Sequence, residues 1–132
     1  MDTLEIIRNA PRVFIIGNGG SYANAMHICN DLLSVGKPAF ALDPSTLTAF
    51  ANDDGYEWVF SKWINVVGER GDVLIALSGS GKSPNILYAI RTAEIIGMTV
   101  IKVFGNELSL NMQASEEYQL VWGHDLWRQL KN

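Results

Sequence analysis

Short, almost wholly apolar runs recur along the chain and alternate with longer segments in which apolar and polar residues are mixed. A strand that is covered on both faces of a sheet is apolar throughout, so each of these runs is predicted to be a buried strand. The runs are residues 12–16, 39–42, 72–77, 98–104 and 118–122. The segments predicted to be helices are residues 3–9, 22–33, 45–50, 57–67, 86–96 and, more weakly, 108–114. The residues from Gly123 onward are expected to form a short tail.

Strands that alternate with helices favour a parallel sheet with helices on both of its faces. We therefore predict an α/β fold with a five-stranded, parallel, doubly wound sheet of the flavodoxin-like kind and the strand order 2-1-3-4-5. The chain has 132 residues, of which 48% are hydrophobic and 18% are charged. This is enough for a single domain, residues 1–132, with its own core.

The loop between the third predicted strand and the helix that follows it is rich in glycine and serine. It reads Ser78-Gly79-Ser80-Gly81-Lys82-Ser83, and Pro84 then fits the first turn of a helix with Ser83 as its N-cap. Such a loop turns backbone N–H groups and the positive end of a helix toward one point, and its small residues let an anion approach closely. We interpret this loop as a phosphate cradle.

Two other interpretations of this loop have to be weighed. The letters Gly81-Lys82-Ser83 resemble the end of a nucleotide-binding P-loop, but the first glycine of that motif would fall at position 76, which is Ala76. A P-loop that hydrolyses nucleotides is therefore disfavoured. The remaining alternative is a turn between strand and helix that binds nothing.

A second loop of the same kind favours the phosphate cradle over the turn that binds nothing. Gly17-Asn18-Gly19-Gly20-Ser21 follows the first predicted strand and opens the next helix. In the predicted order the first and third strands are neighbours at the switch point of the sheet, where folds of this kind bind their ligands. Both loops then face one crevice, and a phosphorylated small molecule is the expected ligand.

Charge and composition exclude several classes of partner. The net charge is −4 and there is no basic run, so nucleic acid is disfavoured. The single cysteine, Cys29, rules out an internal disulfide and is compatible with a reducing compartment. No stretch approaches the roughly 18 apolar residues of a membrane helix, and the acidic residues 1–5 lack the basic start of a signal peptide. We expect a cytoplasmic protein with no membrane partner.

With both loops in view, the chain resembles the sugar-isomerase (SIS) domains, and among them the phosphoheptose isomerases. The resemblance covers roughly residues 12 to 122, and each of its motifs would be weak alone. It is carried by the stretches GNGGS at 17–21, AMH at 25–27, NDDGY at 52–56 with VFS at 59–61, GDVLIALSGSGKSPN at 71–85 and GMTVI at 97–101. It implies an isomerase that converts sedoheptulose 7-phosphate to an aldose 7-phosphate through an enediol.

The resemblance also implies roles for individual residues. Asn18 and Asp53 would contact sugar hydroxyls, and residues of the two loops would bind the phosphate. The phosphate-binding set is Gly19, Gly20, Ser21, Ser78, Gly79, Ser80 and Ser83. The family commonly has a third hydroxyl residue where this chain has Gly79, and often an asparagine where it has Lys82, so the lysine either adds charge to the phosphate site or lies in solvent.

The expected catalytic pair departs from the family pattern. The family has a histidine followed four residues later by a glutamate that is the proposed base, and this chain has His27 and Asp31. The i, i+4 spacing keeps both on one helix face, but aspartate is one methylene shorter, which withdraws its carboxylate by about 1.5 Å, a scale that matters for catalysis. The structural alternatives are a packed helix histidine and a solvated aspartate.

A second departure lies at the ends of the chain. The family carries a long C-terminal helix with a glutamine and a catalytic histidine, and paired N-terminal helices that build its oligomer. Because residues 118–122 are predicted as a strand, Glu116, Glu117 and Gln119 are expected outside such a helix. His124 is the only candidate for the missing histidine, and its register is expected to be unsuitable. The terminal helices are thus expected to be reduced.

The resemblance implies no required cofactor. A zinc ion is possible with His27 and Asp31 as ligands, as in parts of the family, although a catalytic zinc usually has three protein ligands. With too few predicted helices to cover both sheet faces, an exposed apolar patch is expected, so a homo-oligomer, dimer or tetramer, is expected. The tryptophans that have to be placed are Trp58, Trp63, Trp122 and Trp127. The alternative to the isomerase is a non-catalytic SIS module that binds phosphosugars or serves as a protein scaffold.

Overall fold

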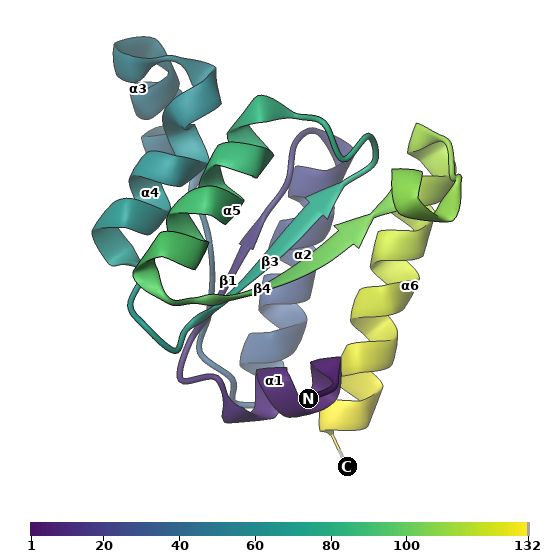
Figure 1. Cartoon of the computed structure of the whole chain (residues 1–132). Coiled ribbons are helices and arrows are strands. Elements are labelled where there is room, and N and C mark those ends of the chain that lie inside the picture. Colours follow the sequence, from purple (N-terminus) through teal and green to yellow (C-terminus); the bar gives the residue numbers. More distant parts are fainter. Residues whose placement is uncertain (132) are drawn as a thin grey trace.

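The computed structural model describes residues 1–131 and shows helices and strands in alternation (Figure 1). The first half comprises α1 (Thr3–Asn9), β1 (Val13–Ile16), α2 (Gly20–Ser34), β2 (Ala39–Ala41) and α3 (Pro44–Asp54). The second half comprises the 3-10 turn η1 (Tyr56–Trp58), α4 (Val59–Val67), β3 (Val73–Ser78), α5 (Pro84–Ile96), β4 (Thr99–Phe104), the 3-10 turn η2 (Gly105–Leu108) and α6 (Met112–Leu130). The first four predicted strands are confirmed to within a residue or so at each end.

The strands form a parallel sheet in the order β2-β1-β3-β4. Val13 of β1 pairs with Ala39 of β2 on one side and with Val73 of β3 on the other, and Val73 pairs in turn with Thr99 of β4. The first four strands of the predicted order are therefore confirmed. Because β1 and β3 are neighbours, the loops that follow them leave the sheet side by side, as the phosphate-cradle interpretation requires.

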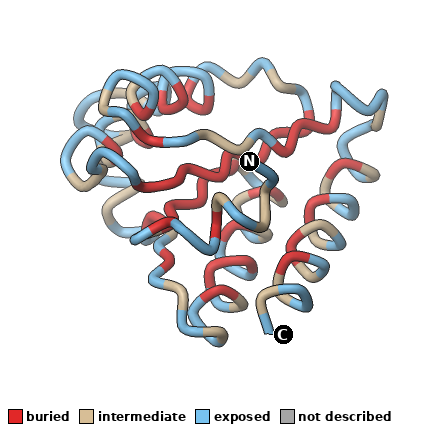
Figure 2. Tube along the Cα trace, turned by 60° about the horizontal axis from the view of Figure 1, so that its bottom comes forward, coloured by how far each residue is buried: buried red, intermediate tan, exposed pale blue. Residues whose placement is uncertain are grey.

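Helices cover both faces of the sheet, so the fold is doubly wound in three layers. The side chains of the strands separate into two buried clusters, one on each face, and the central strands β1 and β3 are buried along their whole length (Figure 2). One cluster joins Ile15 and Ile75 to Ile28 of α2 and Leu126 of α6. The cluster on the other face is formed with α4 and α5 and includes Phe14, Ile16, Phe60, Ile64, Leu74, Ile86 and Ile90.

Side chains and glycine fix where several helices begin and end. Asp2 and Asp43 are N-caps whose carboxylates accept hydrogen bonds from the backbone N–H groups of Glu5 and Thr46. The bond from Thr46 lowers the pKa of Asp43. At the other end, α5 stops at Gly97, whose φ of 99° lies in the left-handed region. The predicted end of this helix at residue 96 and the position of Pro84 in its first turn are thus confirmed.

The prediction of a fifth strand at 118–122 is wrong, because these residues lie in the middle of α6. The sheet has four strands within residues 1–131. The predicted helix at 108–114 and the predicted tail are also wrong, since α6 begins at Met112 and continues to Leu130. The helix predicted over residues 45–50 is longer than expected, because α3 runs on to Asp54 before it is capped by Gly55. The chain therefore has the long C-terminal helix that was expected to be missing.

Helix α6 lies alongside α2 at close range. Gly123 is buried against Ile28, and a Cβ atom at position 123 would lie only 2.6 Å from Ile28 Cγ1. One turn earlier, Asn24 Nδ2 of α2 donates hydrogen bonds to the backbone carbonyl of Glu116 at 2.9 Å and to Gln119 Oε1 at 3.0 Å. Gly123 sets the distance between the two helices because it has no side chain. The two hydrogen bonds of Asn24 set their register.

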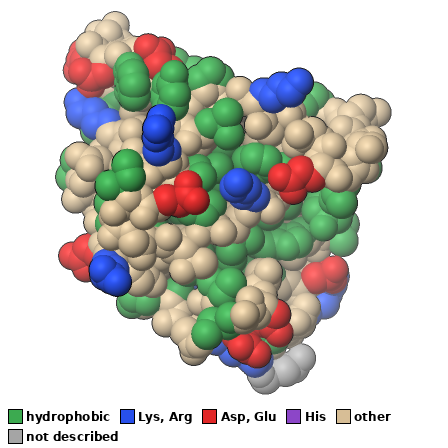
Figure 3. Space-filling view, in the orientation of Figure 1, with side chains coloured by type: hydrophobic (Ala, Val, Ile, Leu, Met, Phe, Trp, Pro, Cys, Tyr) green, Lys and Arg blue, Asp and Glu red, His purple; other side chains and the backbone are tan. Residues whose placement is uncertain are grey.

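The surface agrees with the expectations drawn from charge. On the face shown in Figure 3, lysine and arginine side chains are scattered among acidic ones and form no continuous basic patch. No helix within residues 1–131 combines the length and the apolar character needed to cross a membrane. Cys29 is buried, as expected of a core residue, and burial raises the pKa of its thiol.

The close packing at Gly123 leads to a prediction about stability. Gly123→Val places a branched side chain where Ile28 already lies, so α6 has to move away from α2. Overpacking of this kind is expected to lower the free energy of unfolding by about 1–3 kcal/mol, measured by urea denaturation. Glu117→Val adds the same side chain on the exposed side of α6 and should change stability by less than about 0.5 kcal/mol. Equal stability of the two variants would contradict this account of the helix contact.

Candidate functional site

The two glycine-rich loops meet above the carboxyl ends of β1 and β3, as the sequence predicts. They enclose a small hollow of about 30 Å³, lined from the first loop by Asn18 and Ser21 and from the second by Ser78, Gly79, Ser80 and Ser83. We call this hollow the cradle. Leu77 and Met112 complete its wall. The predicted phosphate-binding serines therefore lie together on one site, and their role in binding stays a prediction.

The cradle hydroxyls are arranged so that their protons remain available. Ser78 Oγ accepts a hydrogen bond from the backbone N–H of Gly81 at 2.9 Å, and Ser80 Oγ accepts one from Lys82 at 3.1 Å. A hydroxyl that accepts through its oxygen still has its O–H to donate. Ser83 occupies the N-cap position of α5 without a capping bond from its side chain. All three hydroxyls can thus donate to an anion at the start of α5.

The place of the family's third hydroxyl is taken by a methionine. A Cβ atom on Gly79 would meet the thioether of Met112, which reaches over from the start of α6. Lys82 is exposed and does not line the cradle. Of the two roles left open for this lysine, the geometry favours the position in solvent.

The remaining residues of the predicted binding set are more dispersed. Gly19 and Gly20 form the N-terminal end of α2, and Gly19 has a φ of 56°, in the region that favours glycine. Asp53 lies exposed near the end of α3, where its carboxylate accepts a hydrogen bond from Asn52 at 3.2 Å. The structure therefore does not bring Asp53 to the cradle lining, and its contact with a sugar stays a prediction.

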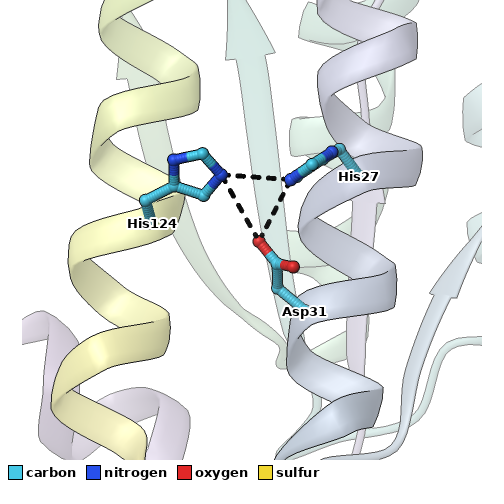
Figure 4. Close-up of side chains that lie close together, drawn as sticks. All are labelled: His27, Asp31 and His124. Atoms are coloured by element: carbon cyan, nitrogen blue, oxygen red, sulfur yellow. Dashed lines mark hydrogen bonds and ion pairs between the residues drawn. The ribbon is translucent and has the colours of Figure 1, made fainter.

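The predicted catalytic pair gains a third member from α6. Figure 4 shows His27 and Asp31 of α2 and His124 of α6 pointing into the space between the two helices. His27 Nε2 lies 3.1 Å from His124 Nε2 and 3.4 Å from Asp31 Oδ2, and His124 Nε2 lies 4.0 Å from the same oxygen. The position of His124 next to His27 corrects the expectation that its register would be unsuitable.

These three side chains fit a zinc ion. Asp31 Oδ2 is buried and receives no hydrogen bond of good geometry within residues 1–131. The three ligand atoms lie within 4.8 Å of one another. A tetrahedral zinc with ligands at roughly 2.0–2.2 Å places neighbouring ligand atoms about 3.3–3.6 Å apart, close to the observed spacing. Two imidazoles and one carboxylate are also a usual set of three protein ligands, so the shortage of ligands expected from the sequence is removed.

The cluster and the cradle lie along the same helix. α2 begins at the cradle, and His27 follows Ser21 by six residues, which is about 9 Å along a helix axis. The carboxylate of Glu116, from α6, lies against Gly20 at the start of α2. The surface between the two sites is therefore formed by α2 and α6 together.

Sequence reasoning missed the contribution of α6. Glu116, Gln119 and His124 were expected outside a C-terminal helix, but all three lie on α6 and the first two contact α2 near its start. Gln119 is buried, and its Nε2 has no hydrogen-bond partner within residues 1–131. The signal that could have revealed the helix is the spacing of Ser115, Gln119 and Gly123, four residues apart.

Comparison with known proteins is consistent with this site. The chain is 48% identical over 108 residues to a phosphoheptose isomerase from Burkholderia pseudomallei (strain 1710b), covering 76% of this chain and 55% of the relative. It is 40% identical over 110 residues to the phosphoheptose isomerase of Glaesserella parasuis serovar 5, covering 78% and 57%. The chain thus spans little more than half the length of these curated relatives.

A solved structure and a family profile give the same result. The phosphoheptose isomerase of Neisseria gonorrhoeae superposes with a TM-score of 0.87 at 29% identity, over 96% of this chain and 79% of that one. Residues 3–105 match the profile of the SIS domain. The resemblance inferred from the two glycine-rich loops is therefore confirmed, and the chain belongs to the SIS domain family.

Proposed function

We propose that this protein is an isomerase of sugar phosphates, and that sedoheptulose 7-phosphate is its substrate. The observation that carries the proposal is an anion cradle at the start of α2 together with a cluster about two turns further along, formed by His27 and Asp31 of α2 and His124 of α6. An open-chain ketose 7-phosphate carries its phosphate at one end and its reacting carbons at the other. Such a substrate fits a site whose two functional parts are separated along α2.

The cradle contributes binding energy at a distance from the reaction. The phosphate accepts hydrogen bonds from the serine hydroxyls of the β3–α5 loop and lies at the N-terminal end of α5. Energy from this remote contact holds the reacting carbons against the cluster and so reduces the entropic cost of the chemical step.

The chemical step moves one proton between neighbouring carbons. Asp31 takes a proton from C1 of the ketose while the C2 carbonyl oxygen gains a proton, which gives the enediol. The proton then returns to C2 and the O1 hydroxyl loses its own, which leaves the aldehyde at C1. His124 and His27 lie next to Asp31, and they are the groups proposed to exchange protons with O1 and O2 of the substrate.

With its two imidazoles acting as metal ligands instead of proton carriers, the same cluster is proposed to hold a zinc ion through His27, Asp31 and His124. When bound, it would supply a Lewis acid that polarises the oxygens of the substrate. No required cofactor was expected from the sequence, and the donor set is the observation that supports a metal.

A homo-oligomer, dimer or tetramer, is proposed as well. Helices cover both sheet faces, so the reason given from the sequence, too few helices, does not hold. Exposed apolar side chains remain nevertheless, including Tyr118 and Val121 on α6, and Figure 3 shows hydrophobic side chains at the surface where β4 and α6 lie. The cytoplasmic location stays a prediction.

The first test concerns the cradle. Replacing both Ser78 and Ser80 with alanine should weaken the binding of sedoheptulose 7-phosphate by on the order of 1 kcal/mol per hydroxyl, because each substitution removes an O–H group that donates to the phosphate. Isothermal calorimetry measures the change. Ser45→Ala removes an exposed hydroxyl at the start of α3 and serves as the control. Unchanged affinity in the double variant would refute the cradle.

The second test concerns the base and separates an isomerase from a binding module. Asp31→Glu should raise the turnover rate, because it restores the methylene that the family's base has, whereas Asp31→Asn should abolish turnover. Affinity for the phosphosugar should barely change in either variant, since the cradle is separate. A coupled isomerase assay gives the rates, and equilibrium dialysis with zinc shows whether Asp31→Asn also loses the metal.

One outcome of the second test would overturn the enzymatic part of the proposal. If the wild type and both Asp31 variants bind the phosphosugar but none turns it over, the protein is a phosphosugar-binding module. Asp125→Asn, on the exposed side of α6, is the matched control and should leave both rate and zinc binding unchanged.

The third test concerns assembly. Sedimentation velocity at micromolar concentration should show a species of two or four chains, because the exposed apolar side chains are removed from water when copies associate. Val121→Lys places a charge among them and should shift the population toward the monomer. A wild type that sediments as a monomer throughout would rule the oligomer out.

A further inference from the structure

The side-chain amide of Asn18, in the loop after β1, is held by three hydrogen bonds. Asn18 Nδ2 donates to Asn85 Oδ1 at 2.9 Å, and Asn85 Nδ2 donates back to Asn18 Oδ1 at 2.8 Å. Tyr56 Oη donates to the same Asn18 Oδ1 at 2.6 Å. The partners come from different elements, Asn85 from the first turn of α5 and Tyr56 from η1. Asn18 is thus fixed from two sides.

Asn85 is committed to this contact by its burial. Only 2% of its surface is exposed, although it directly follows Pro84 at the start of a helix. A buried amide is costly unless it is hydrogen-bonded, and Asn18 supplies both partners. Tyr56 differs in that its side chain is 48% exposed. Its hydroxyl reaches Asn18 from the surface, so it can be changed with little effect on the core.

The side chain of Asn18 keeps one hydrogen-bonding group that these partners do not use. An asparagine side chain has two N–H donors and an oxygen with two lone pairs. Both lone pairs of Asn18 Oδ1 are used, by Asn85 and Tyr56, and one N–H is used by Asn85. Within residues 1–131, the second N–H donor of Asn18 has no partner. Asn18 lines both the cradle and a neighbouring hollow of about 310 Å³ that is also lined by Tyr56 and Asn85.

We propose that Asn85 and Tyr56 are positioning residues that fix Asn18 as a pure N–H donor to an oxygen of the bound phosphosugar. The inference rests on the proposed function, because it takes the cradle ligand to be a sugar phosphate. Without these two partners the amide of Asn18 can rotate and present its oxygen, which repels phosphate and other acceptor oxygens. The pair therefore determines that the ligand atom at Asn18 is an acceptor.

The decisive variant is Tyr56→Phe, which removes one hydroxyl and keeps the ring. The dissociation constant for sedoheptulose 7-phosphate should rise about three- to ten-fold, the loss expected for one hydrogen bond that orients a donor. The melting temperature should not change, because the side chain is half exposed. Tyr88→Phe is the matched control. The exposed Tyr88 stacks on Trp58, and the loss of its hydroxyl should leave the affinity for the phosphosugar unchanged.

A double-mutant cycle shows whether Tyr56 acts through Asn18. In the background of Asn18→Ala, Tyr56→Phe should cause no further loss of affinity, because there is no amide left to orient. Asn85→Leu, which removes both bonds of the amide pair at similar volume, should weaken binding more than Tyr56→Phe and should also have no effect in the Asn18→Ala background. Losses that add in the cycle, or equal affinity of Tyr56→Phe and wild type, would overturn the proposal.

The same titrations identify the oxygen and separate this inference from the proposed function. If the variants weaken the binding of inorganic phosphate as well as that of the phosphosugar, the N–H of Asn18 donates to the phosphate. If they weaken the binding of the phosphosugar alone, the N–H donates to a sugar oxygen. Both results support the positioning role. Binding without turnover in the wild type defeats the isomerase but leaves the cycle interpretable. A wild type that binds neither ligand defeats both proposals.

Discussion

The close approach of α6 to α2 is the contact on which the candidate site depends. Gly123 lets the two helices meet over Ile28, and Asn24 sets their register by binding one carbonyl and one side chain of α6. Because a helix is rigid over a few turns, this register places His124 opposite His27. The sheet contributes by a different constraint, since adjacent parallel strands have to end at one edge and so bring the two glycine-rich loops together.

The two parts of the site differ in how they are built. The cradle consists of backbone and short hydroxyl side chains on loops that a buried sheet holds in place, so its geometry follows from local sequence. The cluster consists of longer side chains on two helices that are far apart in sequence. Local changes in the loops should therefore alter binding, whereas changes in the packing of α6 against α2 alter the spacing of the reacting groups and move the one wall of the cradle that Met112 forms.

This difference explains which parts of the fold and of the site could be predicted from the sequence. The apolar strands and the cradle serines were found because each is encoded by a contiguous stretch, whereas the His27–Asp31 pair was implied by the resemblance to the SIS family. The error at 118–122 arose because Tyr118, Val121 and Trp122 favour strands, while the buried stripe of α6 is Ser115, Gln119, Gly123 and Leu126. A stripe of small and polar residues carries no hydrophobic period, so the four-residue spacing of Ser115, Gln119 and Gly123 is the signal that marks this helix in the sequence. His124 could not be placed without the packing of α6 against α2.

The position of β4 has a consequence for how the protein behaves in concentrated solution. Among the residues that the structure describes, β4 pairs with β3 on one side only, so its other edge offers unpaired N–H and C=O groups that could add a strand from another molecule. Lys102 is exposed in the middle of this strand, and stacking copies edge to edge would bring its charge close to that of a neighbouring copy. That repulsion, together with a strand of only six residues, protects the chain against open-ended growth into fibrils.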